Sequence, residues 1–262
     1  GGLGQITEAT LRLVPAPAAV ATLRVCFASN HAACAAVQRV MRQAVLPCAL
    51  EFMDRRSIDA IQRYGAATDL PAGSEALLMV EADGDAAELP RQIAALEQAL
   101  AGDGLIELRR GFEPAEIARL WAARKSLSHA VKAIAPLKIN EDVVVPVARL
   151  AELVDAIDGL GHRHAIPLVA FGHAGNGNLH VNLMVHPDDT DEMARARACR
   201  QALIETVLRL SGSLSGEHGI GSEKRQFVGL EVDADTLACL RELKALFDPQ
   251  GLLNPGKKLP DA

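Results

Sequence analysis

The order of two hydrophobic patterns constrains the fold of this chain more than any other sequence feature. Short runs with a period of two residues predict strands, and longer runs with a period near 3.6 residues predict helices. In the first part of the chain the order is strand, helix, strand, strand, helix, strand, with one short helix inserted. The strands are expected at residues 20–29, 48–54, 75–84 and 105–110, and the helices at 31–44, 56–65 and 85–102.

The same order begins again after a helix expected over residues 113–133. The second series of elements is expected at residues 138–147, 148–164, 166–174, 178–185, 188–210 and 211–219. This β-α-β-β-α-β order is the ferredoxin-like split βαβ arrangement. We therefore expect an α+β fold in which two ferredoxin-like halves, about residues 19–110 and 137–217, form a mostly antiparallel sheet with helices on one face. Further helices are expected after Ser222 and Asp233, before a tail rich in Pro and Gly.

Composition excludes several classes of function. The net charge of −6 argues against a nucleic-acid partner, which favours a basic face. No apolar run approaches the length of about 20 residues that a membrane span needs, and no secretory signal opens the chain. The five cysteines are scattered without a C-x-x-C pair, which indicates reduced thiols and a cytoplasmic protein.

Two histidines flank an Asn-Gly pair in the stretch "FGHAGNGNLHVNL" at residues 171–183. Asn176-Gly177 predicts a two-residue type I′ hairpin turn, which places His173 directly opposite His180. Asn182 then shares a face with both histidines, because strand side chains alternate between faces. The pair is either a metal-binding element or an ordinary polar hairpin surface.

A second stretch, "SLSGEHGIGSEK" at residues 213–224, holds Glu217 and His218 between glycines. It is either a surface turn or a loop from which Glu217 reaches the face of His173 and His180. Two imidazoles and one carboxylate suit Zn²⁺, Mn²⁺ or Fe²⁺ with coordination positions left open. His218 is better placed as a neighbouring general base than as a further ligand.

Positively charged side chains near a metal site indicate an anionic substrate. The candidate side chains here are Arg124 and Lys138. Ser128 lies one helical turn beyond Arg124 and shares its face. The alternative is that both cations are ordinary solvated side chains.

The first residues, "GGLGQITEATLRLVPAP", form a Gly-rich turn followed by an alternating, strand-like run from Ile6 to Val14. A natural domain seldom begins in this way. We expect the chain to be a fragment whose beginning belongs to another fold unit.

Four ordered motifs together resemble one family: "FGHAGNGNLHVNL", "SGEHGIG", "KINEDVVVP" and "FDPQGLLNPGKKL". They look like the C-terminal domain of FAD-linked oxidases of the vanillyl-alcohol-oxidase superfamily, in the branch of D-lactate, glycolate and D-2-hydroxyglutarate dehydrogenases. The resemblance implies that residues 1–14 are the tail end of a missing FAD-binding domain, and that residues 15–262 are the substrate or cap domain.

The resemblance also implies roles for individual residues. The divalent metal, Zn or Mn in the first place, would be held by His173, His180 and Glu217, with His218 as the base that takes the substrate hydroxyl proton. Arg124 would grip the substrate carboxylate. The remaining positions are implied as further substrate contacts (Ser128, Lys138 and Asn182) and as minor contacts to FAD (Thr7, Glu8 and Asn254).

The implied function is the FAD-dependent oxidation of a D-2-hydroxy acid to the 2-oxo acid by hydride transfer to the flavin. Its implied partners are the small 2-hydroxy acid, the FAD-binding domain and an unidentified electron acceptor. Two alternatives remain: a metal-dependent hydrolase, and a non-catalytic ferredoxin-like binding module. One departure is visible, because many members have Asp-Gly where this chain has Asn176-Gly177, which removes a negative charge near the metal.

Overall fold

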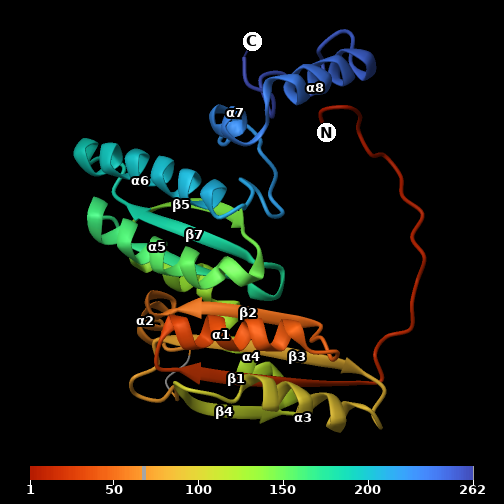
Figure 1. Cartoon of the computed structure of the whole chain (residues 1–262), viewed down its shortest axis with the longest axis vertical. Helices are drawn as coiled ribbons and strands as arrows, with labels where there is room; N and C mark the ends of the chain where they lie inside the picture. Colours follow the sequence, from red (N-terminus) through yellow and green to blue (C-terminus); the bar gives the residue numbers. More distant parts are fainter. Residues whose placement is uncertain (67–68, 262) are drawn as a thin grey trace.

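The computed structural model describes residues 1–66 and 69–261. Within them, seven strands form a single sheet in the order β4-β1-β3-β2-β6-β7-β5, and every neighbouring pair is antiparallel (Figure 1). The strands are β1 (Ala19–Phe27), β2 (Ala49–Asp54), β3 (Ala76–Gly84), β4 (Leu105–Gly111), β5 (Leu137–Val144), β6 (Leu168–His173) and β7 (Asn178–Val185).

The helices follow the predicted order with small shifts at their ends. The α-helices are α1 (Asn30–Arg42), α2 (Arg55–Arg63), α3 (Leu89–Leu100), α4 (Pro114–Ala130), α5 (Leu150–His164), α6 (Thr190–Arg209), α7 (Val228–Glu231) and α8 (Ala234–Phe247). The 3-10 helices are η1 (Val131–Ala133), η2 (Val147–Arg149), η3 (Ala174–Asn176) and η4 (Arg225–Phe227).

The strand order confirms the two predicted ferredoxin-like halves. The order β4-β1-β3-β2 is that of a split βαβ unit, and β6-β7-β5 repeats it in reverse across the sheet. The halves meet where β2 pairs with β6, and we call this pairing the seam. The expected last strand of the second half, residues 211–219, is reduced to a single bridge between Val144 and Ser213. Glycines on both sides of Ser213 weaken strand formation there.

The predicted layer of helices is present, and a second layer lies on the other face. Side chains of α1, α3, α5 and α6 share one apolar core with the sheet. Side chains of α2 and α4 share another core on the opposite face. Strand residues alternate between the two, as Leu78 and Val80 lie in the first core while Leu77 and Met79 lie in the second. The first half of the sheet is therefore covered on both faces.

The strand-like run from Ile6 to Val14 does not form a strand here. The chain is extended but unpaired before Ala19, and it runs away from the sheet toward α8 (Figure 1). Ile6 and Leu13 are each 89% exposed. A strand needs a neighbouring strand to accept its backbone hydrogen bonds, and none of the described residues pairs with this run.

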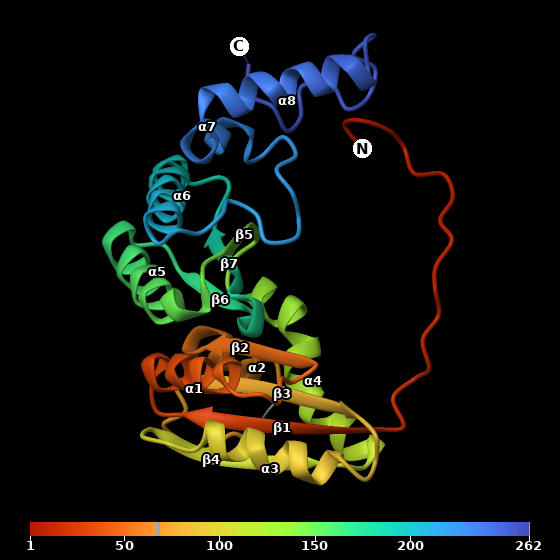
Figure 2. The ribbon, with the colours of Figure 1, turned by 45° about the vertical axis from the view of Figure 1, so that its right-hand side comes forward.

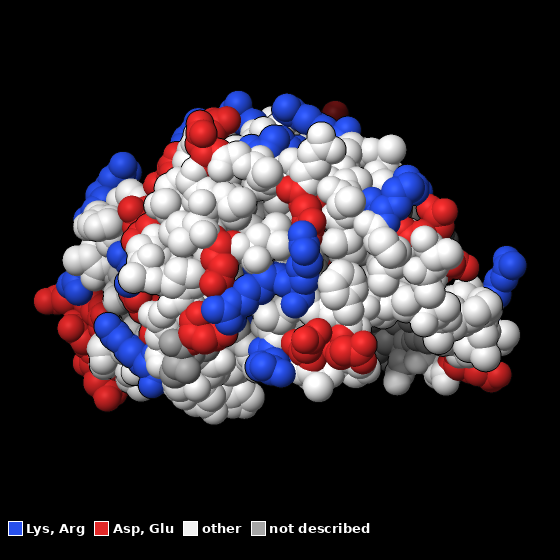
Figure 3. Space-filling model, turned by 90° about the horizontal axis from the view of Figure 1, so that it is seen from below, with Lys and Arg blue, Asp and Glu red and all other residues white. Residues whose placement is uncertain are grey.

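Charge is mixed on the face shown in Figure 3, where both signs lie side by side. Ion pairs join Arg110 to Glu97, and Arg109 to Asp69. Positive and negative side chains therefore alternate on this face of the molecule. Among the described residues, no helix combines the length and the apolar character needed to cross a bilayer.

Candidate metal and substrate site

The helices α5 and α6 lie on one face of the second half of the sheet (Figure 2). The opposite face carries polar side chains. Alternate positions on the paired strands β5 and β7 share this face: Lys138, Asn140, Asp142, His180 and Asn182. On the same face of the first half, Cys26, Met53, Leu77 and Met79 pack against α2 and α4. The contrast between the two halves marks the polar face as the place where a ligand can bind.

The connection between β6 and β7 is longer than the predicted type I′ turn. The helix η3 occupies Ala174–Asn176, and only Gly177 of the Asn-Gly pair has a positive φ, of 70°. His180 consequently lies opposite Phe171, and the predicted register, with His173 opposite His180, was wrong. The shift is an even number of residues, so both histidines still share a face, with ring centroids 5.5 Å apart.

Gly177 makes this connection possible, and its replacement by alanine should destabilise the fold. A Cβ at this position would lie 1.9 Å from the carbonyl oxygen of Val145, and the left-handed backbone itself disfavours a side chain. We expect Gly177→Ala to lower the free energy of unfolding by at least about 1–2 kcal/mol. Urea unfolding measures this loss. Gly229→Ala is the matched control, because a Cβ there meets nothing within 4 Å, and a midpoint equally unchanged in both variants would contradict the argument.

Glu217 lies beside His173 and His180, so the structure brings together the three residues that the sequence analysis proposed as ligands. Its Oε1 lies 3.4 Å from Nε2 of His180 and 3.7 Å from Nε2 of His173. One ligand atom from each residue lies within 4.8 Å of the others. The loop that carries Glu217 follows the single bridge at Ser213 and returns across the polar face. Residues from two strands and one loop therefore converge on a common point.

The donor atoms of this group fit a divalent cation of the zinc type. Two imidazole nitrogens and a carboxylate oxygen form a ligand set that such ions accept, with positions left for substrate or water. Burial lowers the pKa of His180, although the neighbouring Asp142 and Glu217 act in the opposite direction. A neutral imidazole is the form that binds a metal, so burial favours the competent state.

Asp142 holds the loop in place, and sequence reasoning did not assign it a role. One oxygen accepts the backbone N–H groups of Glu217 and His218, each at 2.8 Å, and the hydroxyl of Ser215 at 3.0 Å. The other oxygen accepts the Asn178 amide at 2.7 Å. Burial raises the pKa of Asp142, but these hydrogen bonds outweigh it and lower the pKa overall. The sequence does contain one signal for such a role, because Asp142 is a carboxylate that directly precedes the apolar residues 143–145 of the predicted strand.

His218 lies beside the three ligand-type residues, where a base could act. Its ring stacks on that of His180 with centroids 5.1 Å apart, and its Nε2 is 3.5 Å from Oε1 of Glu217. The His218 side chain is 52% exposed, so a small molecule on the open face can reach the imidazole. Asp142, His180 and His218 form a second group with ligand atoms within 4.8 Å, so His218 could also act as a ligand.

Arg124 lies on α4 close to the same region, and it is held there by Glu51, to which the sequence analysis assigned no role. Its Nε donates to Oε2 of Glu51 at 2.8 Å, and its guanidinium lies 5.1 Å from the ring centroid of Phe171. The other carboxylate oxygen of Glu51 accepts from Nδ1 of His173. Glu51 belongs to β2, and only the pairing of β2 with β6 brings it to this site.

The other three predicted substrate residues differ in their exposure and in their contacts. Ser128 is exposed on α4 beyond Arg124. Lys138 lies on β5, and its partial burial, followed by the charge of Lys132, lowers its pKa. Asn182 is fully buried, and both N–H groups of its amide donate to backbone carbonyls, those of Val169 and His180. Its side-chain oxygen accepts from Asn140, the more exposed amide of the pair.

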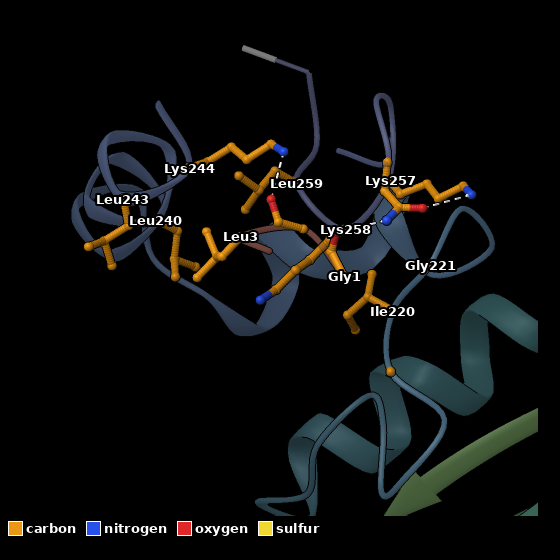
Figure 4. Close-up of a pocket in the computed structure, with 13 residues that line it drawn as sticks. Gly1, Leu3, Ile220, Gly221, Leu240, Leu243, Lys244, Lys257, Lys258 and Leu259 are labelled. Carbon is orange, nitrogen blue, oxygen red and sulfur yellow. Dashed lines mark hydrogen bonds between the residues drawn. The ribbon is translucent and has the colours of Figure 1, made fainter. Parts of the chain in front are cut away.

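Of the three residues implied as flavin contacts, Asn254 lines a cavity and the other two do not. The cavity has a volume of about 460 Å³ and lies among the two chain ends, α8 and the glycine loop after His218 (Figure 4). Asn254 donates to the carbonyl oxygen of Gly1 at 2.8 Å and accepts from Lys257. Thr7 and Glu8 are exposed on the extended first segment.

Fold and site together define a class of protein: an α+β domain with a ligand-type His-His-Glu group beside an arginine. The sequence matches the family "FAD linked oxidases, C-terminal domain" over residues 16–258, and the chain belongs to this family. This confirms the family resemblance carried by the four motifs.

Curated relatives are similar over nearly the whole chain. The chain is 32% identical over 257 residues to the "Glycolate oxidase subunit GlcD" of Bacillus subtilis, and the match covers 98% of this chain and 54% of the relative. It is 30% identical over 263 residues to the "Probable D-lactate dehydrogenase, mitochondrial" of Danio rerio, covering 99% of this chain and 52% of the relative. The chain thus spans about half the length of these relatives.

Among solved structures, p-cresol methylhydroxylase with substrate bound has a similar fold. The TM-score is 0.71 at 11% sequence identity, and the match covers 94% of this chain and 54% of that chain. At this identity the similarity supports the α+β architecture alone.

Proposed function

We propose that this chain is the substrate-side domain of an FAD-dependent dehydrogenase that oxidises a 2-hydroxy acid to the 2-oxo acid. The single observation that carries the proposal is the convergence of His173, His180 and Glu217 on one open sheet face, beside Arg124 and His218. Membership in the FAD linked oxidase family and the names of the two relatives support it.

Each residue of the site has a task in this reaction. The guanidinium of Arg124 binds the substrate carboxylate, because its bond to Glu51 uses Nε and the two terminal amino groups can still form a bidentate pair. His173, His180 and Glu217 would hold a divalent cation, which supplies Lewis-acid polarisation of the substrate hydroxyl when bound. His218 takes the hydroxyl proton at its imidazole as general base.

The two electrons leave the substrate as a hydride from the carbon that carries the hydroxyl group. FAD supplies the acceptor for that hydride. Lys138, on the polar face, and Ser128, on α4, are proposed further contacts to the substrate, and Asn182 acts through the amide of Asn140. Asn254, Thr7 and Glu8 are proposed contacts to the flavin. A separate electron acceptor must reoxidise the flavin after each turnover.

Two further observations concern the side chain of the substrate and the cellular compartment. The names of the relatives favour glycolate and D-lactate, and 2-hydroxyglutarate belongs to the same chemical class. The described cysteines are free thiols, two of them exposed, which supports the cytoplasm as the proposed location.

A test of the proposal uses the complete purified protein. We expect bound flavin, a divalent metal, and reduction of an artificial electron acceptor by at least one of glycolate, D-lactate and D-2-hydroxyglutarate. The corresponding 2-hydroxy methyl esters, which lack the carboxylate, should be poor substrates because Arg124 has no anion to bind. Metal-dependent hydrolysis of those esters, in a protein without flavin, would instead support the hydrolase alternative.

A further inference from the structure

Glu51 joins two parts of the site that the proposed function treats separately. It lies on β2, in the first half of the sheet, and pairs across the seam with His173 on β6. Its side chain is only 7% exposed, and it extends to the polar face rather than to the apolar core that Leu50 and Phe52 enter. Burial of a carboxylate costs free energy unless its oxygens are hydrogen-bonded. Both oxygens of Glu51 accept a hydrogen bond.

The two partners of Glu51 are the proposed carboxylate grip and a proposed metal ligand. Oε2 accepts Nε–H of Arg124, and Oε1 accepts from Nδ1 of His173. A carboxylate that accepts an arginine N–H is an acceptor at both oxygens, so the proton of neutral His173 must lie on Nδ1. Nε2 is then left unprotonated, and Nε2 is the nitrogen that lies 3.7 Å from Oε1 of Glu217.

We infer that Glu51 is a positioning residue that sets the tautomer and ring orientation of His173 for metal binding and, with its other oxygen, orients Arg124 for the substrate carboxylate. The inference rests on the proposed function and deepens it. One carboxylate from the first half of the sheet thus prepares two groups outside that half. The site is complete only when the seam is formed.

Glu51→Gln tests the role toward His173 without using activity. In a glutamine of the same size an NH2 group, which donates, replaces one of the two carboxylate oxygens, so one of the two donors loses its acceptor. Removal of an outer partner of a metal-ligating histidine typically weakens metal affinity 10–100-fold. We expect the dissociation constant for Zn²⁺, measured on metal-free complete protein by competition with a chelator, to rise by about that factor. Glu75→Gln is the matched control, because Glu75 is a half-exposed carboxylate paired with Arg55.

A double variant distinguishes two possible roles of Glu51, which are to orient His173 or only to neutralise the charge of Arg124. If Glu51 only neutralises Arg124, then Glu51→Gln combined with Arg124→Gln should restore zinc affinity to the wild-type value. If Glu51 orients His173, the double variant should bind zinc as weakly as Glu51→Gln alone. Recovery of wild-type affinity in the double variant, or unchanged affinity in Glu51→Gln, would overturn the inference.

The same variants distinguish failure of this inference from failure of the proposed function. If the wild-type protein binds no zinc, the proposed metal site fails, and the inference fails with it. If the wild type binds zinc and Glu51→Gln binds it equally well, only the inference fails. On the substrate side, at saturating metal, Glu51→Gln should raise KM for the 2-hydroxy acid several-fold more than it lowers kcat, because Arg124 loses its anchor. An unchanged KM would overturn that half of the inference.

Discussion

His180→Ala should abolish tight metal binding by this domain. His180 supplies one of the three ligand-type atoms of the site, and its Nε2 lies 3.4 Å from Oε1 of Glu217. Loss of an outer partner already costs about 10–100-fold in metal affinity, so loss of a ligand should cost more than about 100-fold. Metal analysis of the purified protein after dialysis, with zinc titration of the metal-free form, measures the loss.

The control for this variant is His162→Ala. His162 is an exposed histidine on α5 and bonds to the carbonyl oxygen of Asp158, within its own helix. The His162→Ala variant loses an imidazole that lies away from the polar face, so its metal content should equal that of the wild type. Circular dichroism should show that both variants are folded. Equal metal content in His180→Ala and the wild type would contradict the proposed ligand group.

Local sequence patterns were sufficient to predict most of the fold. The alternation of apolar residues in β1 and β3, and the longer period of α1 and α5, depend on neighbours a few positions apart. Such patterns also gave the order of the two halves. They did not exclude a strand at residues 6–14 or at 211–219, because strand formation requires a partner that the local sequence does not specify.

The candidate site was also predicted only in part: contacts within one hairpin were predicted, and contacts between distant residues were not. His173 and His180 lie on one hairpin, so even a register error of two residues left them on one face. Glu51 was missed because the contact with His173 joins residues 122 positions apart through the pairing of β2 with β6. Asp142 was missed because its hydrogen bonds to the Glu217 loop depend on the folded path of that loop. Non-local strand pairing is the part that the sequence alone did not reveal.

His218→Gln should lower kcat of the complete enzyme by about 10²–10⁴-fold while leaving metal binding nearly unchanged. The proposed reaction needs a group that takes the hydroxyl proton, and a glutamine amide cannot do so at neutral pH. His218 contributes none of the three atoms of the His-His-Glu group. It contacts the group by stacking on His180 and by an Nε2 that lies 3.5 Å from Oε1 of Glu217, so the three ligand-type atoms should remain in place. Steady-state kinetics with the preferred 2-hydroxy acid, together with metal analysis of the same preparation, provide both readouts.

The pairing of these two readouts makes the assignment of His218 testable. Asp142, His180 and His218 form the second group of ligand-type atoms, so His218 could instead belong to the metal site. In that case His218→Gln would lose metal together with activity, as His180→Ala does. His129→Gln, at an exposed histidine on α4, should change neither property. A kcat within a few-fold of wild type in His218→Gln would show that the proton goes to another group, because the proposed base would be absent and turnover would continue.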